Sequence, residues 1–198
     1  FYTRYFNWVW TNTLDWNQSL LKNGDLMLNA QAGYESQESQ GYFGSLQNQQ
    51  FPPTLALTWP ASGASPTTAT ASISEYTFTS TFASGNLNYK NRYVVSGSFR
   101  RDGSSQISPT NRWQNFWAVG GAWEISREKF FQKQTIFDYA KLKASYGVLG
   151  NQNTYGFDYP FYPGLSAGNA AVFGNLVYNA YSQSYLPNTN LKWETVNA

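Results

Sequence analysis

The residues most able to do chemistry are few and scattered in this chain. Its 198 residues include no histidine and no cysteine, which removes the commonest general base and any thiolate nucleophile. A Ser-His-Asp triad is therefore excluded. Glu35 with Glu38 is no more than a chance pair for a two-carboxylate mechanism, and the same holds for Asp15 with Asp25. The sequence predicts no enzyme, no cofactor and no metal site.

Aromatic side chains are the stronger candidates for binding. The segment 151–186 is rich in Tyr and Phe, which stand among Asn, Gln and Ser. Exposed rings beside amide groups can stack on sugars or grip peptide backbones. The alternative is that these rings pack the segment onto itself or onto a partner. The candidate contacts with a ligand or a partner are Tyr155, Phe157, Tyr159, Phe161, Tyr162, Tyr178 and Tyr181.

The overall composition is neutral and polar rather than ionic. Charged residues make up 12% of the chain and aromatic residues 19%, with a net charge of +2. This balance gives no support for nucleic-acid binding, because the basic residues form no stripe. No run approaches the roughly 18 apolar residues of a membrane-spanning helix, and residues 1–4 do not open a signal peptide. Strands would therefore have to make any membrane crossing.

Hydrophobic residues alternate with a period of two through most of the chain, which indicates β-strands. In 25–35, for example, Leu26, Leu28 and Ala30 share one face, and Met27 and Asn29 share the other. Strands are predicted at 7–16, 25–35, 75–88, 92–100, 113–125 and 139–149, and a seventh begins near residue 192. The apolar positions of 75–88 are out of step, and a β-bulge near Gly85 would reconcile them.

The predicted connections alternate between short turns and longer loops. Tight turns are expected at 22–24 and 90–91, and longer loops at 36–74, 101–112 and 150–191. Transmembrane barrels show the same asymmetry between their two ends. Strands of roughly 10 to 14 residues suit a tilted bilayer crossing of about 9 to 11 residues better than a sandwich strand of about five or six.

We therefore predict an all-β fold, an antiparallel segment of a transmembrane β-barrel with about six to seven strands. A membrane sheet has to close, and so few strands fall below the smallest barrel of eight; the chain is expected to be a slice of a larger polypeptide. Aromatic residues near strand ends are expected to form the girdles at the membrane surfaces. The girdle candidates are Trp8, Trp16, Tyr34, Tyr93, Trp113 and Trp123.

Four motifs in order carry a resemblance to a known family. They are NYKNRYVVSGSFRRDGSS, NRWQNFWAVGGAWEISREKF, LKASYGVLGNQ and NLKWET, which lie between Tyr89 and Thr195. Together they resemble the C-terminal barrel region of the SusC/RagA family of TonB-dependent outer-membrane transporters, as found in Bacteroidetes. Differences from the family pattern fall in loops or at strand ends, as at Gln106-Ile107, and leave the substrate undetermined.

The resemblance implies a fold and a function for the whole protein. Residues 1–198 would be part of a barrel domain of 22 strands, with the plug, the TonB-contacting segment and the signal peptide upstream. The implied function is import of oligosaccharides or peptides across a Gram-negative outer membrane, together with a SusD-like lid lipoprotein and the TonB complex.

The stretch SFRRDGSS is predicted to lie at the outer rim of this barrel. Arg100 is expected to point into the lumen and to pair with Asp102, while Arg101, Asp102 and Gly103 turn the chain where water begins. Arg101 alternatively touches the phosphates of outer-leaflet lipid.

Two other classes of protein remain open from the sequence. The first is a soluble or secreted β-sandwich that binds carbohydrate through its aromatic residues. The second is a structural surface protein without transport, which a full-length gene lacking a plug domain would indicate.

Overall fold

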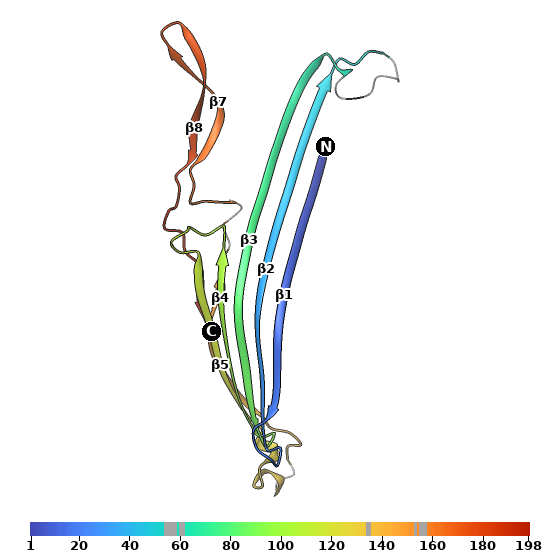
Figure 1. The fold of residues 1–198 in the computed structure, drawn as a ribbon, viewed down its shortest axis with the longest axis vertical. Helices are drawn as coiled ribbons and strands as arrows, with labels where there is room; N and C mark the ends of the chain where they lie inside the picture. The colour runs from blue at the N-terminus through green and yellow to red at the C-terminus, as the bar shows by residue number, and fades with distance from the viewer. Residues whose placement is uncertain (54–58, 60–61, 134–135, 153, 155–157) are drawn as a thin grey trace.

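The computed structural model describes residues 1–53, 59, 62–133, 136–152, 154 and 158–198. Its main feature is one antiparallel sheet of seven strands in the order β1-β2-β3-β4-β5-β6-β9 (Figure 1). The strands of this sheet are β1 Tyr2–Ser19, β2 Leu26–Gln49, β3 Ser65–Tyr89, β4 Tyr93–Ser104, β5 Trp113–Trp123, β6 Leu142–Asn151 and β9 Glu194–Asn197. A separate hairpin pairs β7 (Gly164–Phe173) with β8 (Leu176–Tyr185). The predicted all-β antiparallel fold is confirmed, including the strand that begins near residue 192.

Two tight turns join the first strands at the lower end of the sheet in Figure 1. Gly24 adopts a φ of 76° in the turn between β1 and β2. Lys90 and Asn91 both have a φ of 53°, and the Arg92 amide donates to the Tyr89 carbonyl at 2.9 Å. Positive φ at both central residues of this turn matches the right-handed twist of the flanking strands, and residues 90–92 lie between the last pair of the ladder, Tyr89 and Tyr93. Two short 3-10 helices, η2 (Ile125–Arg127) and η3 (Phe131–Lys133), lie in the third connection at this end.

The first three strands are longer than the sequence predicted. β2 has 24 residues and β3 has 25, whereas a bilayer crossing needs about 9 to 11. The expected loop 36–74 is therefore wrong in its bounds, since most of it continues the β2–β3 ladder as far as Gln49 paired with Ser65. The expected loop 101–112 begins later, because β4 runs to Ser104. The expected loop 150–191 contains the β7–β8 hairpin, which projects away from the sheet (Figure 1).

Alternation of side chains gives the sheet two different faces. We call the face that carries Asn29, Ser96 and Ser145 the polar face, and the face that carries Leu28 and Ala144 the apolar face. One row of the polar face runs across six strands through Asn17, Asn29, Asn86, Ser96, Gly120 and Ser145. The next row of the apolar face contains Trp16, Ala30, Gly85, Gly97, Val119 and Tyr146.

The predicted bulge near Gly85 is wrong. The β2–β3 register is unbroken from Leu26 opposite Tyr89 to Gln47, and its shift lies between Gln47 and Asn48. Phe78 and Phe82 consequently lie on the polar face. A Cβ added at Gly33 would collide with the Phe82 ring, so this ring occupies the space that the glycine leaves.

The described residues form no second layer against the sheet. Their buried apolar core is confined to Ile107, Phe116, Phe161 and Trp193, while Leu14, Val95 and Leu142 on the apolar face are 74%, 62% and 60% exposed. A sandwich would bury such residues between two sheets, so the β-sandwich alternative is wrong. No helix in the described part of the chain is long and apolar enough to cross a membrane.

Candidate functional site

Arg100 is the centre of a charged cluster on the polar face. Its Nε donates to Asp102 Oδ1 at 2.7 Å, and its Nη2 donates to Glu35 Oε1 at 3.2 Å and to Ser80 Oγ at 2.6 Å. We call Arg100, Asp102, Glu35 and Ser80 the Arg100 cluster. Its members come from β2, β3 and β4, so one guanidinium ties three strands together through charge-assisted hydrogen bonds.

Two aromatic rings lie beside the same guanidinium. Arg100 Cζ is 5.9 Å from the centroid of Phe78 and 5.7 Å from that of Phe82. Such contacts restrict a long side chain to one orientation. Asp102 is 6% exposed and Ser80 is fully buried, so the rings and the arginine together cover the polar groups beneath them.

The predicted Arg100–Asp102 pair is confirmed, whereas the predicted turn at 101–103 is wrong. Asp102 and Gly103 are still paired in the β3–β4 ladder, opposite Ser80 and Thr79. The strand continues because the buried Asp102 carboxylate is satisfied by Arg100 and needs no water. The chain reverses only in 105–112, between β4 and β5.

An apolar cluster anchors this reversal on the polar face. Ile107, Phe116 and Trp193 are buried together. The Trp193 ring is edge-on to Phe116 at 5.5 Å and to Phe78 at 6.1 Å. Its Nε1 donates to the Arg112 carbonyl at 2.9 Å, so the NLKWET motif packs directly on the segment that follows SFRRDGSS.

The loop aromatics divide into packed and exposed groups. The Tyr159 hydroxyl donates to the Glu75 carbonyl, and Phe161 is 7% exposed, so these two rings fasten the chain to β3 and to itself. Tyr162, Tyr178 and Tyr181 are 60%, 50% and 70% exposed and remain open to a ligand or a partner. Tyr155 and Phe157 lie outside the described residues.

All six girdle candidates lie on the apolar face by register. Tyr93 stacks on Trp123 at 6.4 Å near the short turns. Away from the turns, Tyr34 meets Trp10 edge-on at 6.0 Å, and Trp8 Nε1 donates to Glu38 at 3.0 Å. That these rings mark the two membrane surfaces stays a prediction.

Glu128 joins the lower ring pair to the connection between β5 and β6. Its carboxylate accepts the Tyr93 hydroxyl at 2.6 Å and the Trp123 indole N–H at 3.2 Å, with Arg92 at 3.5 Å. These hydrogen bonds, helped by Arg92, hold the pKa of Glu128 below its ordinary value of 4.5.

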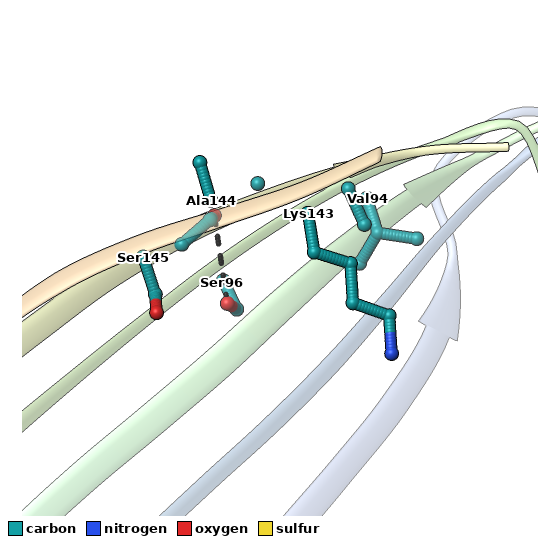
Figure 2. Close-up of a pocket in the computed structure, with 8 residues that line it drawn as sticks. Val94, Ser96, Lys143, Ala144 and Ser145 are labelled. Carbon is teal, nitrogen blue, oxygen red and sulfur yellow. Dashed lines mark hydrogen bonds between the residues drawn. The ribbon is translucent and has the colours of Figure 1, made fainter. Parts of the chain in front are cut away.

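The part of the sheet formed by β4, β5 and β6 carries mostly small side chains. A shallow hollow of about 250 Å³ there is bordered by Val94, Ser96, Gly120, Gly121, Ala122, Lys143, Ala144 and Ser145. In Figure 2, Ser96, Lys143 and Ser145 point to one side of the sheet and Ala144 to the other. The Ser96 hydroxyl is 3.5 Å from the Gly120 carbonyl. The hollow contains no catalytic set.

Sequence similarity points to one group of proteins. The chain is 36% identical over 134 residues to the TonB-dependent receptor P26 of Formosa agariphila, which covers 65% of this chain and 13% of that receptor. It is 36% identical over 115 residues to the TonB-dependent receptor SusC of Bacteroides thetaiotaomicron, covering 56% of this chain and 11% of SusC. No protein-family model matches the chain.

Solved structures show the same fold. The RagAB peptide transporter superposes with a TM-score of 0.81 over 98% of this chain and 21% of the other chain, at 24% identity. The chain resembles part of a SusC/RagA-like TonB-dependent receptor. The open-open state of the RagAB peptide importer gives a TM-score of 0.81 at 25% identity, over 98% of this chain and 20% of that one. These relatives are named as receptors, transporters or importers, and this chain spans only 11% to 21% of each.

The sequence predicted the Arg100–Asp102 pair but not the other residues that contact Arg100. Glu35 contacts Arg100 from 65 positions away, and Ser80 contacts it from the neighbouring strand β3, 20 positions away. No local pattern signals either contact. The mismatch of Phe78 and Phe82 with the apolar period was the available signal, since it indicates rings on the polar face.

Loss of the Arg100 guanidinium is expected to destabilise the sheet. Arg100→Met would leave the Asp102 carboxylate buried without its partner, which costs about 2 kcal/mol of unfolding free energy for a hydrogen-bonded charge. Lys143→Met is the matched control, because it removes one charge from the same face, where Lys143 is exposed. Thermal unfolding of the full-length protein in neutral detergent measures both; equal melting temperatures for the two variants would contradict the role given to Arg100.

The lowered pKa of Glu128 predicts that the stability of the protein depends on pH. A folded-state pKa below the unfolded value stabilises the protein above about pH 4.5, and this contribution is lost as the pH falls through the folded value. Wild type should therefore melt higher than Glu128→Gln near neutral pH, and the difference should shrink in acid. A difference that stays constant from about pH 7 to about pH 3 would rule out the carboxylate as its cause.

Proposed function

We propose that this chain forms wall and rim of an outer-membrane importer that takes up oligosaccharides or peptides. The observation that carries the proposal is the seven-stranded antiparallel sheet, whose apolar face no other described part of the chain covers. The RagAB peptide transporter superposes on 98% of this chain. An apolar face of this kind is stable only against an apolar surrounding, which a bilayer supplies. The polar face then lines a wet lumen, and TonB acts through a segment of the protein outside this chain.

The strand lengths support a wall that rises above the membrane. From Tyr93 to Arg101, β4 spans about 27 Å along its axis at about 3.4 Å per residue. A strand tilt of about 40° reduces this length to a rise of about 21 Å, which is comparable with the height of about 25 Å expected of a lipid-facing band. β2 and β3 continue well beyond this level with Ser, Gln and Thr on both faces. Figure 1 shows these strands reaching far past the loop between β4 and β5.

A SusD-like lid is the partner that fits the exposed β7–β8 hairpin. Its strands pair with each other and not with the main sheet, and a lone two-stranded hairpin is marginally stable in water. Phe173 and Val177 near its tip are both 70% exposed. Contact with a lid would bury these side chains, and Tyr162, Tyr178 and Tyr181 would face the captured substrate or the lid.

Membrane placement is tested by arginine at two neighbouring positions. Ala144 is predicted to face lipid and Ser145 the lumen, on opposite sides of β6 (Figure 2). Ala144→Arg in the full-length protein should cost about 2 to 4 kcal/mol, because a charge on the lipid face near the bilayer midplane loses its hydration. Ser145→Arg is the control and should be mild. Unfolding in lipid vesicles measures both, and equal costs would refute the assignment of the two faces.

The lid contact is tested at the hairpin tip. Phe173→Ser with Val177→Ser should reduce the amount of lid lipoprotein recovered with the affinity-tagged receptor, because the apolar contact is lost. Ile73→Ser is the control, since Ile73 is 65% exposed on β3, outside the hairpin. Unchanged recovery with the double variant would show that the lid binds elsewhere.

A further inference from the structure

Arg101 is a charged residue on the apolar face of β4 that import does not explain. It follows Phe99 on this face and lies opposite Thr81 of β3 and Asn115 of β5. Arg101, Thr81 and Asn115 are all exposed. A guanidinium, a hydroxyl and an amide thus stand side by side at the level where the apolar face ends.

An aromatic ring holds the Arg101 side chain in place. Arg101 Cζ lies 5.4 Å from the centroid of the Trp113 ring. A Cβ added at Gly103 would lie 2.7–2.9 Å from three atoms of the same ring. The ring therefore lies directly on the backbone of Gly103. Any other residue at this position of SFRRDGSS would place a side chain where the Trp113 ring lies.

The donors of Arg101 are open to a ligand. Arg92, Arg100 and Arg127 each pair with a carboxylate, whereas within the described ranges no carboxylate oxygen lies within 4.0 Å of the Arg101 guanidinium. A guanidinium presents a planar fork of N–H groups that matches phosphate geometry. Arg101, on the apolar face, thus lacks an acidic partner such as the one that Arg100 has on the polar face.

We propose that Arg101, with Asn115 and Thr81 beside it, binds the phosphate of a lipid headgroup at the outer edge of the membrane. The proposal rests on the membrane placement proposed above, which sets this cluster at headgroup height. A cation at that level keeps its charge in the polar zone while its stem and the Trp113 ring cover the apolar zone. The site would fix the tilt and depth of the rim beneath the loop 105–112.

The test compares a phosphorylated lipid with the same lipid lacking its phosphate. Full-length receptor in neutral detergent is titrated with lipid A monophosphate and with dephosphorylated lipid A, and bound lipid is counted by native mass spectrometry. Wild type should prefer the phosphorylated form. Arg101→Gln should weaken its binding about fivefold, the effect of one basic side chain near an anionic surface. Lys143→Gln, which removes the same charge from the polar face, should leave binding unchanged.

Each result supports or overturns the proposal. Equal affinity of wild type and Arg101→Gln for the phosphorylated lipid overturns it. Inorganic phosphate, tested alone, should bind much more weakly because no acyl chain is buried; equally tight binding would overturn the lipid source of the phosphate. If Arg101→Gln binds the phosphorylated lipid as well as wild type does, while Ala144→Arg is clearly more destabilising than Ser145→Arg, only the lipid site is refuted. Equal costs for Ala144→Arg and Ser145→Arg refute the membrane placement itself.

Discussion

The architecture depends on one constraint: neighbouring strands pair their backbone hydrogen bonds within the plane of the sheet, and both faces of the sheet stay exposed. Alternate side chains then meet two different surroundings, and neither is another layer of the described chain. Leu, Val, Ala and aromatic side chains on one face require an apolar solvent. Asn, Ser and Gln on the other tolerate water. The exposed apolar residues therefore form a face suited to an apolar surrounding, and they are not a defect of packing.

The motifs that look separate in the sequence form one structural unit near the outer ends of β4 and β5. Arg100 links β4 to β2 and β3, and Trp193 fastens the end of the long third loop to Phe116 and the Arg112 carbonyl. Phe78 contacts both Arg100 and Trp193. This shared ring couples the charged cluster to the apolar one, so the polar face is stiffened where its loops begin.

The two faces of SFRRDGSS perform different tasks. Arg100 and Asp102 turn to the polar face and neutralise each other, which holds strands together. Arg101 and Gly103 turn to the apolar face, where the glycine seats Trp113 and the arginine keeps its donors open. Adjacent arginines thus differ in role because the side-chain period of a strand is two. The hairpin beyond them adds a third surface, where Phe173 and Val177 are exposed near the tip.

The sequence by itself determined the fold class, the tight turns at Gly24 and Lys90-Asn91, the Arg100–Asp102 pair and the resemblance to SusC/RagA-like receptors, because alternation, turn chemistry and i,i+2 spacing are local properties. Tertiary structure alone decided the lengths of β2 and β3, the contacts of Glu35 and Ser80 with Arg100, and the packing of Trp193. Polar strands above the apolar band carry no periodic signal, since both of their faces meet water. Contacts between residues 20 to 81 positions apart depend on register, which only the assembled ladder fixes.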